Sequence, residues 1–187
     1  MTFAASAESG AIDKIRAHPP QDLTGSFVAT VRARAEAGEL PLFAWSLGLP
    51  QPALGRLLGE FGLSSADLAQ LTAAEFHRLE QLTPAAFHEL RRMLFEHRTK
   101  LLDPAQADSL ARALAGACFG SLPLWEDAGF ADETELASFI GTFFAPLAQK
   151  YRNCRHWKRE FFKDLHRQSQ VKPAIAELLL KCFLLRQ

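Results

Sequence analysis

The sequence predicts an all-α fold, a single-domain multi-helix bundle, and three observations lead to this prediction. Apolar residues recur at spacings of three and four along most of the chain, which is the period of an amphipathic helix. The alternating β-branched pattern of a strand is absent. Ala, Leu, Glu and Arg, which favour helices, dominate the composition together with Phe.

Capping signals mark several helix starts. Thr72-Ala73-Ala74-Glu75 has the spacing of a capping box, and Asp132 precedes Glu135 by three residues. Thr83-Pro84 and Asp103-Pro104 each place a cap residue before a proline at the first helical position. Together with the apolar spacing, these signals predict helices over residues 9–17, 23–37, 40–47, 51–60, 65–70, 73–80, 84–98, 104–118, 132–150, 152–169 and 173–185.

Length and composition indicate one domain. The 187 residues divide most simply into a flexible or loosely packed N-terminal arm, residues 1–20, and a helical domain, residues 21–187. The chain is 48% hydrophobic without a run of about twenty apolar residues, so we expect a soluble protein. The first residues lack a basic start followed by an apolar run, which favours the cytoplasm over secretion.

Charge and motifs exclude several functional classes. The formal net charge is zero, so an attraction to nucleic acid or membrane would require a local patch, and we expect neither as a partner. The sequence has no glycine-rich phosphate loop, no H-E-x-x-H and no G-x-S-x-G. We therefore expect a protein that is not an enzyme.

Four motifs occur in a fixed order between about Leu110 and His166: Ala117-Cys118, the run 124–130 that begins Leu-Trp-Glu-Asp, the run 144–148 that reads Phe-Ala-Pro-Leu-Ala, and Trp157-Lys158-Arg159. Their order and spacing resemble the NifQ family, bacterial proteins that deliver molybdenum for assembly of the iron-molybdenum cofactor of nitrogenase. The resemblance implies an all-α metallochaperone that binds molybdenum as molybdate. It also marks four residues as family-matched structural positions: Trp125, Asp127, Trp157 and Lys158.

The chain departs from the family pattern where metal ligands are expected. Pro123 stands where the family usually has His, Tyr151 where it usually has Asn, and His166 where it usually has Cys. The family's C-terminal C-x4-C-x2-C-x5-C run is missing. Because thiolates hold iron-sulfur clusters, this loss argues against a cluster in this chain.

The three cysteines, Cys118, Cys154 and Cys182, are separated by dozens of residues. Helical phase places each of them on an apolar face, where a free cysteine behaves as a small hydrophobic residue. We therefore favour core packing, and keep convergence of the three thiols on a metal as the alternative.

The predicted helix from about Arg152 to Arg167 is amphipathic. At about 100° per residue, Cys154, Trp157, Phe161 and Leu165 share one side. The other side gathers cationic residues and histidines: Arg152, Arg155, His156, Arg159, Lys163, His166 and Arg167. We call this set the cationic strip.

Three interpretations of the cationic strip remain open. It can bind an oxyanion such as molybdate or phosphate, because guanidinium groups supply paired donors. It can dock on an acidic protein surface such as that of a cofactor-assembly protein. It can also be a solvated helix face. RNA binding is disfavoured because the aromatic residues are predicted to point inward.

Two further positions have metal-binding and structural interpretations. Glu126 and Asp127 could offer carboxylates to a metal, but adjacent helical positions diverge, so capping by Asp127 and packing by Trp125 are favoured. His97 is either a ligand or the polar end of a helix.

The resemblance to the NifQ family therefore implies an accessory protein of nitrogen fixation that binds or delivers molybdenum. The alternative is a protein-protein adaptor that keeps the helical scaffold without a metal cargo.

Overall fold

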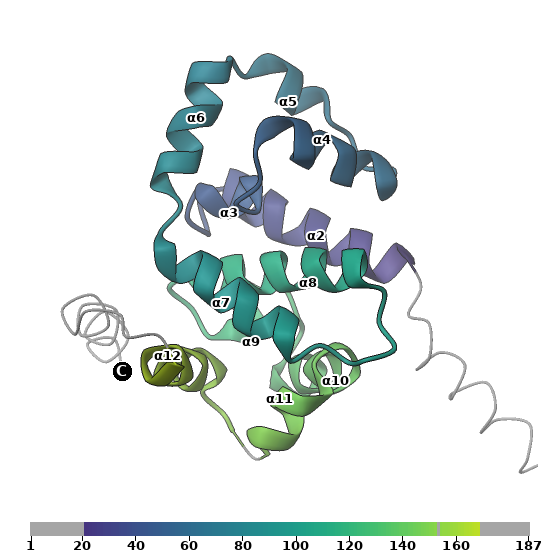
Figure 1. Ribbon diagram of the computed structural model, residues 1–187, viewed down its shortest axis with the longest axis vertical. Helices are drawn as coiled ribbons and strands as arrows, with labels where there is room; N and C mark the ends of the chain where they lie inside the picture. The colour runs from purple at the N-terminus through teal and green to yellow at the C-terminus, as the bar shows by residue number, and fades with distance from the viewer. Residues whose placement is uncertain (1–20, 153, 169–187) are drawn as a thin grey trace, which may run out of the picture.

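The computed structural model describes residues 21–152 and 154–168, and these residues form helices and connecting turns without a strand (Figure 1). The all-α fold class predicted from the sequence is confirmed. The predicted helices 9–17 and 173–185 and the predicted arm 1–20 lie outside the described residues. The elements are α2 (Gln21–Glu36), α3 (Phe43–Ser46), α4 (Gln51–Glu60), α5 (Ala66–Gln70), α6 (Ala73–Leu82), α7 (Ala85–Glu96), α8 (Pro104–Ala117), α9 (Leu124–Asp127), α10 (Glu133–Phe143), α11 (Ala145–Lys150) and α12 (Trp157–Gln168).

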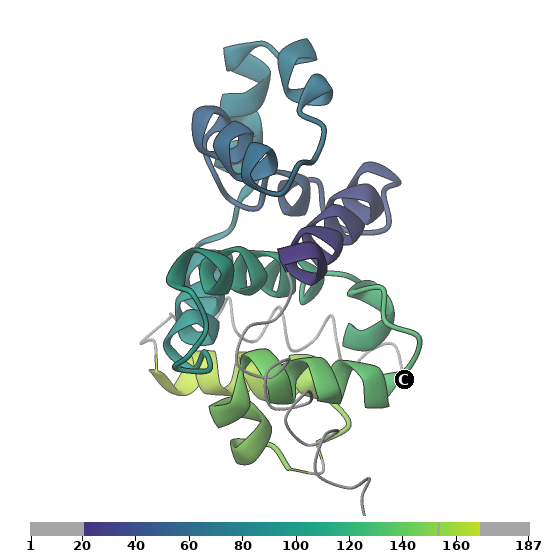
Figure 2. The same cartoon turned by 90° about the vertical axis from the view of Figure 1, so that its right-hand side faces the viewer.

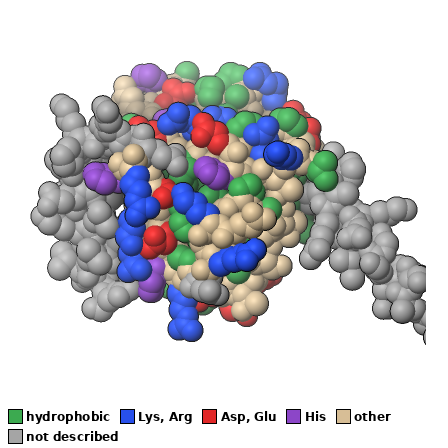
Figure 3. All heavy atoms as spheres, turned by 60° about the horizontal axis from the view of Figure 1, so that its bottom comes forward, with side chains coloured by type: hydrophobic (Ala, Val, Ile, Leu, Met, Phe, Trp, Pro, Cys, Tyr) green, Lys and Arg blue, Asp and Glu red, His purple; other side chains and the backbone are tan. Residues whose placement is uncertain are grey.

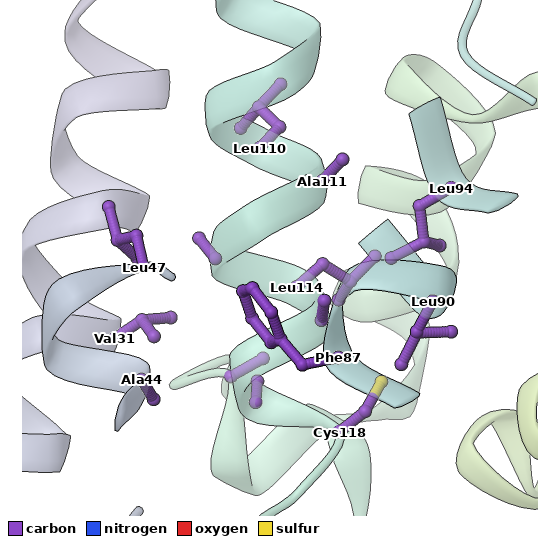
Figure 4. Packing of buried hydrophobic residues seen from close by; sticks show 14 of the residues in the cluster. Val31, Ala44, Leu47, Phe87, Leu90, Leu94, Leu110, Ala111, Leu114 and Cys118 are labelled. Carbon is purple, nitrogen blue, oxygen red and sulfur yellow. The ribbon is translucent and has the colours of Figure 1, made fainter. Parts of the chain in front are cut away.

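Helix α8 forms the centre of the core, because it packs against α2 on one side and α7 on the other. Leu110, Ala111 and Leu114 of α8 are fully buried. Figure 4 shows Val31 of α2 on one side of α8 and Leu90 of α7 on the other. Burying α8 between two helices requires apolar residues around most of its circumference, and its many alanines allow the close approach.

Helices α4, α5 and α6 lie beyond α2 and α3 at the opposite end of the molecule from α10, α11 and α12 (Figure 2). A hydrogen bond links α4 to α5: Gln51 Nε2 of α4 donates to the carbonyl of Leu68 in α5, 2.9 Å away. Trp45 of α3 packs against Phe76 of α6 with ring centroids 6.5 Å apart. The aromatic contact between Trp45 and Phe76 thus joins helices α4, α5 and α6 to the rest of the core.

Three of the predicted capping signals form as expected. The Thr72 hydroxyl accepts the Glu75 N–H while the Glu75 carboxylate accepts the Thr72 N–H, which completes the capping box. Asp103 accepts the backbone N–H groups of Ala105 and Gln106, and Asp132 accepts that of Glu135. These bonds satisfy N–H groups that a helix start leaves unpaired.

Thr83 does not cap the helix that follows it. Its hydroxyl donates to the Leu79 carbonyl at the end of α6, 3.2 Å away, and α7 begins at Ala85 without a side-chain cap. The prediction was wrong because the same hydroxyl can bond the preceding helix.

The predicted helix 132–150 is two helices, α10 and α11, which meet at Phe144. Pro146 lacks an N–H group and therefore cannot continue the backbone hydrogen-bond pattern of α10. Thr99, far away in sequence, stabilises the break: its N–H donates to the Phe143 carbonyl and its hydroxyl to the Thr142 carbonyl, both at 2.8 Å. Pro146 is thus a local signal for the break, and the contacts of Thr99 stabilise it at Phe144.

Two further boundaries differ from the prediction. The helix predicted over 152–169 begins only at Trp157, and the short helix α9 was not predicted. No helix in the described part of the chain is long and apolar enough to cross a membrane.

The turn between α3 and α4 requires a glycine. Leu47 and Gly48 have φ values of 55° and 60°, and Arg112 of α8 donates to both of their carbonyls, at 3.1 and 3.3 Å. A Cβ on Gly48 would lie 2.4 Å from Cε1 of Phe87, which is fully buried. The turn thus depends on a left-handed backbone and on a close approach by an aromatic ring.

Gly48→Ala should destabilise the fold more than Gly38→Ala. Both glycines have positive φ, which costs about 1 to 2 kcal/mol for alanine. A Cβ on Gly38 meets nothing within 4 Å, so only Gly48→Ala adds overpacking against Phe87, worth about 1 to 3 kcal/mol more. Urea unfolding of both variants measures the difference, and equal losses would contradict the packing of Phe87 on Gly48.

Candidate functional site

A buried ion pair connects two of the motifs. Asp127 ends α9 and Lys158 lies in the first turn of α12, and their side chains are 0% and 8% exposed. Lys158 Nζ donates to Asp127 Oδ2 and to the carbonyls of Gly120 and Leu122, the latter two at 3.0 and 2.5 Å. The ammonium group has three N–H donors, so these partners satisfy it completely.

The carboxylate of Asp127 also organises the loop between α8 and α9. Its Oδ2 accepts the Leu122 N–H at 3.1 Å. A Cβ on Gly120 would lie 2.2 Å from the same oxygen, so only glycine fits there. Asp127 Oδ1 is buried without a hydrogen-bond partner in the described residues. Burial raises the pKa of Asp127, against the opposing effects of Lys158 and the Leu122 N–H.

Trp157, next to Lys158, anchors α12 through aromatic contacts. Its side chain is buried, and its ring packs edge-on against Tyr151 and at a tilt against Phe161, with centroids 6.1 and 5.8 Å apart. Trp125 of α9 is partly buried and packs against the core. The structure therefore brings Asp127 and Lys158 into direct contact and places both tryptophans in packing roles.

Asp164 of α12 forms a second buried acidic centre. Its carboxylate accepts hydrogen bonds from Lys150 and from the Tyr151 hydroxyl, and Arg167 lies 3.4 Å away. Burial acts to raise the pKa of Asp164, but the bonds from Lys150 and Tyr151 hold it below its usual value. Asp164 therefore stays charged and attracts cations to α12.

The cationic strip is only partly helical. Arg152, Arg155 and His156 precede α12 and lie exposed in the turn before it, which corrects the predicted helix start. Arg159, Lys163 and His166 lie on α12, and all except the half-buried Lys163 are exposed. Figure 3 shows lysine and arginine side chains gathered with histidines on this end of the molecule.

Acidic residues pair with only part of the cationic strip. Glu160 accepts from Lys163 at 2.9 Å and from Arg159 at 3.3 Å, and Lys163 lowers the pKa of Glu160. Among the described residues, Arg152 and Arg155 have no ion-pair partner. Two guanidinium groups are thus available to an anion.

The two described thiols do not suit metal ligation. Cys118 follows α8, is fully buried, and has a pKa that burial raises to about 12. Cys154 is partly buried in the turn before α12, not on a helix as predicted, and burial raises its pKa as well. Neither thiol belongs to a group of three His, Cys, Asp or Glu side chains that could hold a metal ion among the described residues. Cys182 lies outside the described residues.

Other potential ligands are also dispersed. His97 caps α7 at its C-terminal end, with Nδ1 2.8 Å from the Met93 carbonyl. Within residues 21–152 and 154–168, no three His, Cys, Asp or Glu side chains come together in a way that could hold a metal ion. The described donors therefore do not fit an iron-sulfur cluster.

Comparison with protein families gives one match: the NifQ family model matches residues 27–176. The chain belongs to the NifQ family. No curated protein matches it, and no solved structure does. The match includes both partners of the Asp127–Lys158 pair and the whole of the cationic strip. In this member of the NifQ family, Pro123 occupies the N-cap position of α9, next to Leu122, whose carbonyl accepts from Lys158.

Lys158→Met should destabilise the protein by about 3 to 5 kcal/mol, because it leaves the Asp127 carboxylate buried without its counter-charge. Lys100→Met, at an exposed position, is the matched control and should change little. Adding Asp127→Asn to Lys158→Met should recover part of the loss. Urea unfolding measures all three variants, and a loss equal to that of the control would contradict the buried pair.

The loss caused by Lys158→Met should be larger at pH 8 than at pH 5. Without the lysine, the folded-state pKa of Asp127 rises further above its unfolded value of about 4. The folded variant then holds a proton that the unfolded chain releases, so its stability falls as pH rises above about 4. Unfolding curves at both pH values check this, and a pH-independent loss would disagree with a buried carboxylate.

Cys118 should resist alkylation in the folded protein while Cys154 reacts slowly. Iodoacetamide attacks thiolates, and Cys118 is fully buried with a pKa of about 12. Peptide mass spectrometry at pH 8 resolves each cysteine, and a denatured sample is the control. Equal rates at Cys118 and Cys154 in the folded protein would show that Cys118 is accessible.

Proposed function

We propose that this NifQ-family protein takes up molybdenum as molybdate and delivers it for assembly of the iron-molybdenum cofactor of nitrogenase. The observation that supports the proposal is the pair of exposed arginines, Arg152 and Arg155, which have no acidic partner among the described residues, in a chain of this family. The role is that of a carrier, with molybdenum as cargo and no catalytic step.

The oxyanion form of the cargo follows from the donors available. Molybdate presents tetrahedral oxygens, and a guanidinium group offers paired N–H donors to such oxygens. Arg155 lies just before α12 and Arg159 in its first turn, so both belong to the same part of the surface. Arg159 forms an ion pair with Glu160, whereas Arg155 has no ion-pair partner among the described residues.

Cargo held on an iron-sulfur cluster is less compatible with this chain. Cys118 is inside the core and Cys154 is partly buried, so the described thiols give no common centre for iron. The same observation favours a second candidate function, an adaptor that retains the NifQ scaffold and its partner contacts without a metal. Both candidates place the protein in the cytoplasm, beside other cofactor-assembly proteins.

Equilibrium dialysis against molybdate, read by elemental analysis, should give stoichiometric molybdenum on the native protein. Arg152→Glu with Arg155→Glu should weaken this binding about tenfold or more, because repulsion replaces two donors. Arg56→Glu with Arg92→Glu changes the charge equally at exposed positions outside the strip and should bind normally. A native protein without molybdenum would reject the carrier in favour of the adaptor.

Anaerobic reconstitution with iron and sulfide tests the nature of the cargo site. The protein should remain colourless in the region of thiolate-to-iron absorption and should bind no stoichiometric iron. A coloured protein with stoichiometric iron would reject the oxyanion form of the proposal.

A further inference from the structure

The neutral chain has a strongly uneven charge distribution. Residues 150–167 contain seven lysines and arginines and two acidic residues, which leaves fourteen basic and nineteen acidic residues in the rest of the chain. An excess of positive charge is therefore concentrated between the end of α11 and the end of α12, where Lys158 alone is buried and paired with Asp127. Such asymmetry steers a partner of opposite charge toward one face of a protein.

Helix α12 presents part of this charge in a regular row along its length. Arg159, Lys163 and Arg167 follow one another at four-residue spacing, so they lie on one side of the helix over about 12 Å. His166 is exposed beside Arg167. We call Arg159, Lys163, His166 and Arg167 the outer row.

The acidic residues of α12 hold the outer row in place. Glu160 contacts Arg159 and Lys163, and the buried Asp164 contacts Arg167. Contacts of this kind reduce the side-chain freedom that would be lost on binding, while three cations against two carboxylates leave the row positive. Asp164 is only 3% exposed, so its charge is mostly hidden from a partner.

The opposite side of α12 packs against the core. Phe161, Phe162 and Leu165 are buried, and α12 packs against α7. Figures 1 and 2 show α12 at the edge of the described part of the molecule. The outer row is therefore a preorganised, positively charged face that lacks exposed aromatic residues.

We infer that the outer row of α12 is a docking surface for the acidic face of another protein. The inference rests on the proposed function, because a carrier and an adaptor both need a partner, and it names the chemistry of that partner. Single-stranded nucleic acid fits less well, since its binding relies on aromatic side chains that stack with bases, and the aromatics of α12 are buried.

The test uses a fluorescent peptide of mixed glutamate and aspartate as the probe, with binding measured by anisotropy at low salt. Lys163→Ser with Arg167→Ser should weaken binding about tenfold or more. Arg56→Ser with Arg92→Ser, which removes the same charge elsewhere, should bind like the native protein. Binding should weaken as salt rises, because exposed charges are screened. Thermal melting should be similar for both variants.

Three outcomes would overturn the inference. Equal loss of peptide binding in both variants would show that net charge, not the outer row, is responsible. Tighter binding of a single-stranded RNA, or self-association that requires Lys163 and Arg167, would assign the surface to nucleic acid or to a second copy of this chain.

Molybdenum content separates this inference from the proposed function. The Lys163→Ser, Arg167→Ser variant keeps Arg152 and Arg155, so it should lose peptide binding and retain molybdate. A native protein that binds the peptide but no molybdate would reject the carrier and leave the docking surface standing.

Discussion

The buried contact between Asp127 and Lys158 determines where α12 lies, and with it the whole cationic surface. One ammonium group satisfies a carboxylate and two loop carbonyls, so the loop between α8 and α9, the short α9 and the start of α12 meet at a single atom. Such a pair contributes little net stability relative to apolar residues of the same size, but removal of one partner is costly. Its main effect is therefore to allow one arrangement of these three elements.

This arrangement places aromatic side chains and the Cys118 thiol in the interior and most of the cationic side chains on the surface. Trp157 and Phe161 bury one side of α12, and Cys118 lies in the same interior as a small apolar residue. Glu160 and Asp164 hold the cations on or beside the outer side. Cys118 is thus withdrawn from solvent and Cys154 is partly buried, while the guanidinium groups of Arg152, Arg155 and Arg159 are exposed.

The sequence predicted the helices best where their signals are local. The capping box at Thr72 and the caps at Asp103 and Asp132 form as expected, because each bond joins residues within three positions. The break at Phe144, which was not predicted, combines the local effect of Pro146 with contacts from Thr99, 43 positions from its acceptor Thr142. Helix α12 begins at Trp157, five residues later than predicted. Cys154 therefore lies before the helix, and its predicted place on an apolar helix face was wrong.

By itself, the sequence determined the all-α class, most helix boundaries and the membership of Asp127 and Lys158 in family-matched motifs. Only the tertiary structure decided that these two residues form one ion pair, since they lie 31 positions apart and nothing in their local sequence specifies a partner. It also decided which cations are paired and which are available, as with Arg159 and Arg155. Local hydrogen bonds depend on the identity of neighbouring residues and can be predicted from them. Burial and long-range pairing form only when the chain packs into its tertiary structure.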